Sequence, residues 1–135
     1  MELLLDEEAG AAGRGSIAVL VPCHNEAATV AGVVCDFLAV LPEADIVVID
    51  NASGDETARI AREAGARVVR ETRKGKGFAL QRGLEEVPDA DFVIMVDGDG
   101  TYFGTDAPRL LAAARDGADM VIGTRLASTE KGAFP

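Results

Sequence analysis

Short runs of apolar residues alternate along this chain with longer segments whose apolar residues recur at helical spacing. The short runs are rich in β-branched side chains and bounded by polar or turn residues, which predicts buried strands of a parallel sheet. The five predicted strands cover residues 17–21, 46–49, 67–70, 92–96 and 120–122. We expect Pro22 to stop the first of them.

Four helices are expected between these strands. The first ends near Leu41, and its apolar residues share one helical face: Val30, Val33, Val34, Phe37, Leu38 and Leu41. The second ends near Ala64, with Ser53 or Asp55 as a cap and Gly65 as its stop. The third carries Leu80, Leu84 and Val87. The fourth is capped by Thr105 or Asp106 and ends at Gly117.

The strand–helix alternation predicts an α/β fold, a parallel sheet with helices on both faces. Ligands of such sheets bind beyond the carboxyl ends of the strands. Polar residues follow those ends here: Glu26, Asp50, Asp97 and Arg125 come after or end the first, second, fourth and fifth strands. Residues distant in sequence are therefore expected to converge on one edge.

The fourth strand runs into two carboxylates, Asp97 and Asp99, one residue apart and each followed by glycine. Two neighbouring anions repel unless a cation lies between them. A divalent ion of the Mg²⁺ or Mn²⁺ type prefers such oxygen ligands and often shares them with substrate phosphates. A calcium loop is excluded, because its sixth and twelfth positions would be Tyr102 and Pro108. A solvated turn with two incidental aspartates stays open.

Composition narrows the class of ligand. The 135 residues suit one domain, and the hydrophobic content of 48% is that of a globular chain. A net charge of −10, with 4% aromatic residues and no Trp, argues against nucleic-acid or anionic-membrane binding. An anionic ligand would need a local cation. The glycine-rich loop with Arg73, Lys74 and Lys76 is either a phosphate contact or a solvated loop.

Several other classes are not supported. The glycine fingerprint of dinucleotide-binding proteins and the P-loop motif are absent. His24 is the only histidine, and we favour a binding-loop role over a general base. Cys23 and Cys35 form no disulfide or metal framework, so a reduced, cytoplasmic setting is expected. No apolar run approaches the ~20 residues of a membrane span. Residues 1–15 are expected to be a disordered leader, and residues 16–135 the domain.

Five motifs, in order, resemble family 2 glycosyltransferases with the GT-A fold. Four are similar to the family's Pro-x-x-Asn-Glu, second aspartate, Gly-Lys-Gly-x-Ala and Asp-x-Asp motifs, and the fifth to a strand of the polyprenyl-phosphate (dolichol-phosphate mannosyltransferase-like) branch. They lie at residues 21–26, 50–57, 75–79, 97–99 and 121–125. The resemblance covers residues 16–135 and implies a Rossmann-like, three-layer α/β/α sandwich.

The resemblance also implies roles for individual residues. Nucleotide binding would fall to Pro22, His24, Glu26, Asp50, Lys76 and Gly98, with Asp50 reading the base. Asp97 and Asp99 would hold Mg²⁺ or Mn²⁺ on the diphosphate, and Thr101 would assist. Arg125 would face the phosphates. With Asp97 and Asp99 it would form the catalytic group.

The implied reaction is inverting transfer of a sugar from a nucleotide-diphosphate sugar to polyprenyl phosphate at the cytoplasmic membrane face. Family members continue past the position of Pro135 with their acceptor side, so we expect a donor site beside an incomplete acceptor site. A non-catalytic nucleotide-sugar-binding module, or one half of a two-chain enzyme, is the alternative. A nucleotidyltransferase is the third. Self-association or a partner chain would cover the open sheet edge.

Overall fold

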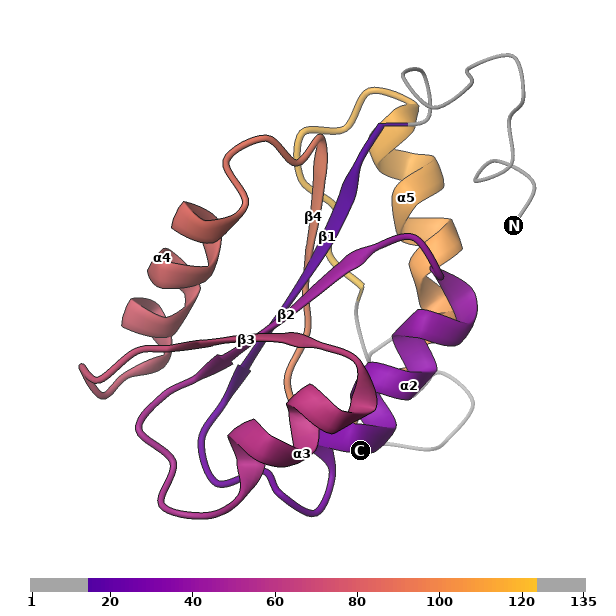
Figure 1. The fold of residues 1–135 in the computed structure, drawn as a ribbon. Coiled ribbons are helices and arrows are strands. Elements are labelled where there is room, and N and C mark those ends of the chain that lie inside the picture. Colours follow the sequence, from indigo (N-terminus) through magenta and orange to yellow (C-terminus); the bar gives the residue numbers. More distant parts are fainter. Residues whose placement is uncertain (1–14, 124–135) are drawn as a thin grey trace, which may run out of the picture.

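The computed structural model describes residues 15–123 and has the predicted alternation of strands and helices (Figure 1). In chain order the elements are β1 (Ile17–Cys23), α2 (Val30–Val40), β2 (Asp45–Asp50), α3 (Thr57–Ala64), β3 (Arg67–Arg70), α4 (Lys76–Glu86), β4 (Phe92–Met95), the 3-10 helix η2 (Gly104–Asp106) and α5 (Ala107–Arg115). Gly65 and Gly117 follow α3 and α5 with φ of 113° and 116°, which confirms the predicted glycine stops.

The four strands of the described chain form a parallel sheet in the order β3-β2-β1-β4. The chain therefore moves outward from β1 to β3, and α4 then carries it back to the far side of β1. This reversal makes the carboxyl ends of β1 and β4 the switch point of the sheet, where open α/β folds bind ligands. The predicted fold class is confirmed.

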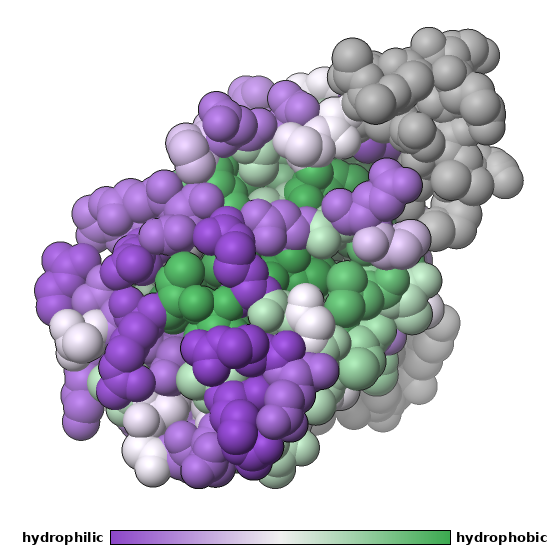
Figure 2. All heavy atoms as spheres, viewed as in Figure 1, coloured by the Kyte–Doolittle hydropathy of each residue, from purple (hydrophilic) through white to green (hydrophobic). Residues whose placement is uncertain are grey.

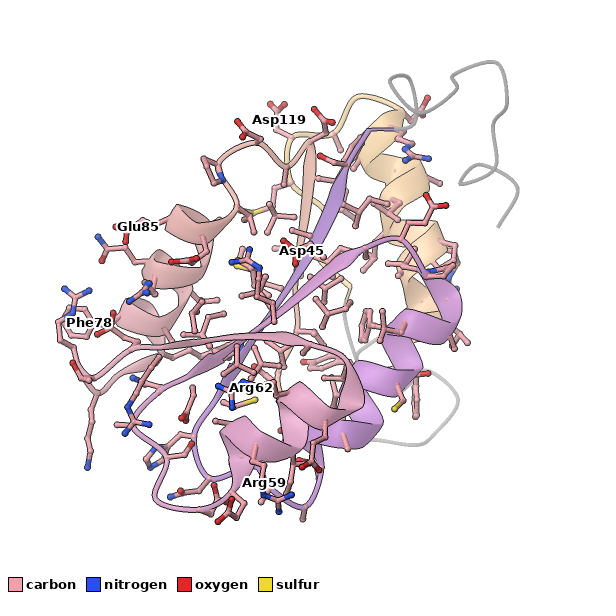
Figure 3. The ribbon with its side chains drawn as sticks, viewed as in Figure 1. Asp45, Arg59, Arg62, Phe78, Glu85 and Asp119 are labelled. Carbon is pink, nitrogen blue, oxygen red and sulfur yellow. The ribbon has the colours of Figure 1, made fainter. Side chains whose placement is uncertain are left out.

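Helices cover both faces of the sheet, so the molecule has three layers. Figure 1 shows α4 on one face and α2, α3 and α5 on the other. Alternate residues of β1 supply the two cores, as strand geometry requires. Val19 and Val21 pack under α2, whereas Ala18 and Leu20 pack with α4. On the outer surfaces, Figure 3 shows Glu85 on α4 and Arg59 on α3 pointing away from the sheet, and hydrophilic residues dominate those parts of Figure 2.

The buried face of α4 is built mainly from small residues. Val87 is buried, but Leu84 is 47% exposed, and Ala79 and Gly83 take the inward positions. A β-carbon on Gly83 would lie 2.9 Å from Cδ1 of Ile49. These small residues let α4 approach the sheet closely. The spacing of the leucines does not reveal this close approach.

Pro22 does not stop β1, which continues to Cys23 and pairs Pro22 with Ile49 of β2. The reason lies on the other side of the strand. β4 pairs with β1 only as far as Leu20, whose carbonyl accepts from the Val96 amide at 3.0 Å. Pro22 faces that same side, so its missing N–H deprives no neighbouring strand of a hydrogen bond.

The predicted fifth strand is wrong. Residues 120–122 pair with no strand in the described part of the chain, and the side chains of Met120 and Ile122 are largely exposed. Three apolar residues are a minimal strand signal, and an extended segment becomes a strand only when a neighbour takes its backbone hydrogen bonds. No helix between residues 15 and 123 has the length and apolar character to cross a bilayer.

Candidate functional site

Asp50, the predicted reader of the base, is the last residue of β2 and only 2% exposed. Its Oδ1 accepts from the Ser53 amide at 3.1 Å, and its Oδ2 pairs with Nη1 of Arg70 at 3.1 Å. The protein thus satisfies both oxygens of this buried carboxylate. Each oxygen has a further lone pair, so Asp50 can still accept a hydrogen bond from a ligand.

The loop after β1 is held in place through His24 and Asn25. His24 Nδ1 lies 2.8 Å from the carbonyl oxygen of Asn51, and because a carbonyl can only accept, Nδ1 donates. Nε2 is then an acceptor, 3.3 Å from the side-chain amide nitrogen of Asn25. Both ring nitrogens are thus engaged within the loop, and the binding-loop role of His24 stays a prediction.

Two other predicted nucleotide-binding residues lie on either side of His24. Pro22 is half-buried inside β1. The backbone N–H of Glu26 donates to Oγ1 of Thr57 at 2.9 Å, and Thr57 is fully buried at the start of α3. The loop is therefore fixed between β1 and α3.

Lys76 and Asp97 meet across the carboxyl edge of the sheet. Lys76 is the first residue of α4, and Asp97 follows β4. The Lys76 ammonium lies 2.5 Å from Oδ1 of Asp97, and the two side chains are 62% and 34% exposed. A cation thus already stands beside the first carboxylate of the predicted metal motif.

The rest of that motif forms a tight turn. Oδ1 of Asp99 accepts from the amide of Thr101 at 3.0 Å and from its hydroxyl at 2.7 Å. Thr101 therefore orients Asp99, whatever else its oxygen binds. Gly100 adopts φ of 81°, and the Thr29 hydroxyl at the start of α2 donates to the Gly98 carbonyl at 2.6 Å.

Gly98 is buried against β1. A β-carbon there would lie only 2.4 Å from Sγ of Cys23, closer than any real contact. Only glycine therefore lets the turn between the two aspartates pack on the end of β1. This packing is the structural reason for glycine at the middle of the motif.

The strand ends concentrate negative charge. The pKa of Cys23 is raised to about 12, first by burial and then by the carboxylates of Glu26, Asp50, Asp55 and Asp97. Four anions thus act on one thiol at the end of β1. An anionic ligand at this edge needs a cation to offset their repulsion.

The two aspartates supply some, but not all, of the ligands that a metal ion needs. Between residues 15 and 123, no group of three or more His, Cys, Asp and Glu side chains could hold a metal ion. Asp97 and Asp99 offer the hard carboxylate oxygens that Mg²⁺ and Mn²⁺ prefer, and these ions commonly complete their coordination with water and substrate phosphates. The donor set therefore fits a metal that arrives with, or is completed by, a diphosphate.

Arg73 and Lys76 of the basic loop have different partners. Glu71, 5% exposed, accepts from the backbone N–H of Arg73 at 2.8 Å and from its Nε and Nη2 at 3.0 Å. These contacts lower the pKa of Glu71 to about 2. Arg73 also lies 4.6 Å from the ring centroid of Phe78, which Figure 3 places at the N-terminal end of α4. Arg73 shapes the loop, whereas Lys76 reaches the aspartate.

Asn51, next to Asp50, is a buried residue whose contacts the sequence did not reveal. Its side chain bonds to Glu71, Arg73 and Gly75, all in the segment before α4. A polar residue directly after a buried strand was the only available signal. Arg125, the remaining predicted site residue, lies outside the described residues.

Comparison with known proteins identifies the family. The model for "Glycosyl transferase family 2" matches residues 18–134, so this chain belongs to that family. Glycosyltransferase AglJ of Haloferax volcanii is 42% identical over 119 residues, 88% of this chain and 39% of AglJ. Protein RfbJ of Shigella flexneri is 44% identical over 111 residues, 82% of this chain and 85% of RfbJ. A dolichyl-phosphate hexose transferase of Haloferax volcanii is 34% identical over 82% of this chain and 48% of its own length.

Solved structures share the fold. Glucosyl-3-phosphoglycerate synthase from Mycobacterium tuberculosis, in complex with Mg²⁺ and UDP, matches with a TM-score of 0.72 and 31% identity over 86% of this chain and 43% of that one. The same enzyme with Mn²⁺, UDP-glucose and phosphoglyceric acid matches with a TM-score of 0.70 and 29% identity, over 84% and 43%. This chain spans less than half of that enzyme and of AglJ.

Proposed function

We propose that this chain carries the nucleotide-sugar site of a metal-dependent, inverting glycosyltransferase whose acceptor is a polyprenyl phosphate. The contact between Lys76 and Asp97 carries the proposal, because it brings the N-terminus of α4 to the carboxyl end of β4. In this arrangement Asp50 takes the base, as the family resemblance implies. Lys76, Asp97 and Asp99 lie toward the diphosphate, and Arg125 is assigned to its phosphates.

A metal ion bound there would neutralise charge on the departing nucleoside diphosphate. Mg²⁺ and Mn²⁺ are both candidates, since the related synthase has been crystallised with each. Asp97 and Asp99 would hold the ion, and Lys76 would pair with a diphosphate oxygen. Thr101 would keep Asp99 turned toward the ion through its two hydrogen bonds.

The chemistry needs little help from a base. A phosphate oxygen of the acceptor forms a bond to the anomeric carbon as the bond from that carbon to the diphosphate breaks, which inverts the configuration. A phosphate monoester is mostly ionised at neutral pH, with its second pKa near ~6, so the nucleophile has no proton to lose. His24, whose ring nitrogens bond to Asn51 and Asn25, is not required as a base.

The lipid acceptor has two supports. One is the resemblance of residues 121–125 to the polyprenyl-phosphate branch, and the other is the similarity to a relative named as a dolichyl-phosphate hexose transferase. We further propose that the protein works at the cytoplasmic face of the membrane. Self-association or a partner chain would cover the outer edge of β4, which pairs with β1 alone among the described strands.

The test is release of nucleoside diphosphate from UDP-glucose and GDP-mannose by the purified chain with Mn²⁺ in detergent micelles. Polyprenyl phosphate is the acceptor, and the unphosphorylated polyprenol is its matched control. Release that requires the phosphate supports the transferase. Tight donor binding without release would favour the nucleotide-sugar-binding module, and release of pyrophosphate from a nucleoside triphosphate would favour a nucleotidyltransferase.

A further inference from the structure

We infer that Asn51 is a positioning residue that sets where Lys76 stands and thereby controls affinity for a nucleoside diphosphate. The inference about the ligand rests on the proposed function. The inference about position rests on contacts of the side chain itself. Asn51 is 6% exposed and directly follows β2, next to Asp50.

The amide of Asn51 holds the segment that precedes Lys76. Its Nδ2 donates to the carbonyl oxygens of Glu71 at 3.1 Å and Arg73 at 2.8 Å. Its Oδ1 accepts from the backbone N–H of Gly75 at 2.9 Å. Three of the four hydrogen bonds that a side-chain amide can form thus go to three residues within the five-residue stretch 71–75. The backbone pairing of β2 with β3 ends at Asp50 and Arg70, and beyond it the Asn51 side chain supplies the hydrogen bonds to the segment before α4.

The bond to Gly75 is the one that reaches the site. Gly75 is the residue before Lys76, and its φ of 134° with ψ of 137° is a conformation that other residues rarely adopt. Its carbonyl accepts the first bond of the next turn, from the amide of Ala79 at 3.1 Å. Because Asn51 fixes the peptide on one side of Gly75, it also fixes the origin of α4 and the direction of the Lys76 side chain.

The backbone of Asn51 meets the other half of the site. Its N–H donates to the Cys23 carbonyl at 2.8 Å, and its carbonyl accepts from His24 Nδ1 at 2.8 Å. One residue thus touches both the loop assigned to the nucleoside and the segment that leads to the diphosphate contact. An alanine at this position keeps the backbone bonds to the first and loses all three side-chain bonds to the second.

This asymmetry gives an experiment with two readouts. The first, amide hydrogen exchange of Gly75 by NMR, needs no ligand. Exchange should be slow in the wild type and in Thr72→Ala, a control at an exposed position in the same segment, and much faster in Asn51→Ala. Equal protection of the Gly75 amide in Asn51→Ala would overturn the positional claim.

The second readout is titration with UDP and with uridine in the presence of Mn²⁺. Asn51→Ala should bind UDP about tenfold more weakly and uridine almost unchanged, since only bonds toward Lys76 are lost. In a Lys76→Ala background the same change should have no further effect on UDP, because Asn51 acts through Lys76. Equal losses for both ligands, or additive losses in the double variant, would overturn the inference.

Failure of a variant to fold and failure of the proposed function are distinguishable. If Asn51→Ala does not melt cooperatively, Asn51→Ser, which retains a short polar group, takes its place in both readouts. If wild-type protein binds neither UDP nor GDP while the Gly75 amide behaves as expected, the nucleotide-binding function fails and with it the effect on diphosphate affinity, whereas the positioning of Lys76 by Asn51 stands.

Discussion

The ammonium of Lys76 lies 2.5 Å from Oδ1 of Asp97, although the two residues are 21 positions apart in the chain. For this pair to form, the N-terminus of α4 and the carboxyl end of β4 have to lie at the same edge of the sheet. In the absence of ligand the lysine offsets part of the charge of the acidic edge. In the proposed function, Lys76 would pair with the diphosphate and Asp97 would help to hold the metal.

Replacement of Lys76 by alanine tests the phosphate role. We expect Lys76→Ala to weaken UDP binding about tenfold and uridine binding little, because the lost ammonium faces the diphosphate only. Calorimetry with both ligands measures the difference. Arg109→Ala is the matched control, since Arg109 is an exposed cation of α5 that pairs with Asp106. A parallel loss of UDP and uridine affinity would contradict a phosphate contact.

Gly98→Ala tests the packing of the aspartate turn on β1. The new β-carbon would meet Sγ of Cys23 at 2.4 Å, so we expect a loss of about 1–3 kcal/mol in the free energy of unfolding. The double variant Gly98→Ala with Cys23→Ala removes the sulfur, and the next contacts, to Glu26 and the Pro22 carbonyl, are ordinary at 3.5 Å. Urea unfolding should show the double variant to be more stable than Gly98→Ala. A double variant that is less stable would mean that the sulfur is not the obstacle.

The lowered pKa of Glu71 predicts that the fold loses stability in acid. Its pKa is lowered to about 2 in the folded protein, first by the side-chain hydrogen bonds from Arg73, against 4.5 ordinarily. A depressed carboxyl pKa stabilises the fold above the unfolded value, and this contribution is lost as the pH falls from about 4.5 through about 2.

Melting temperatures across that range measure the effect. Glu71→Gln should melt below the wild type at pH 6, and the gap should narrow as the pH falls toward 2. Glu85→Gln, on the outer face of α4, should follow the wild type throughout. A constant gap between Glu71→Gln and the wild type would exclude the ion pair as its cause.

The sequence was sufficient for the elements whose stability comes from apolar burial. Residues 46–49 are completely apolar and are buried in β2, and the apolar face from Val30 to Phe37 is the buried face of α2. The convergence of Asp50 and Asp97 at one edge also followed from the alternation of strands and helices. Parallel topology alone brings such residues to one side.

The features that the sequence did not reveal involve residues whose role depends on partners distant in sequence. Pro22 continues β1 because β4 has already left that side, and Leu84 is exposed because Gly83 seats α4 on Ile49. Arg73 carries a charge suited to phosphate, yet a buried glutamate takes it. In the sequence Asn51 looks like an ordinary turn residue. In the structure its side chain bonds to two carbonyl oxygens and one backbone N–H of the segment before α4.

The most direct test of a metal-dependent donor site is calorimetric titration of the purified chain with UDP and GDP, each with and without Mn²⁺, beside Asp99→Asn. Asparagine keeps an oxygen that can accept from Thr101 and removes the charge, so the variant isolates the metal interaction. We expect one nucleotide to bind and Mn²⁺ to strengthen this binding in the wild type only. Affinity that is the same with and without Mn²⁺, or an equal gain in Asp99→Asn, would contradict a metal-dependent donor site at this edge of the sheet.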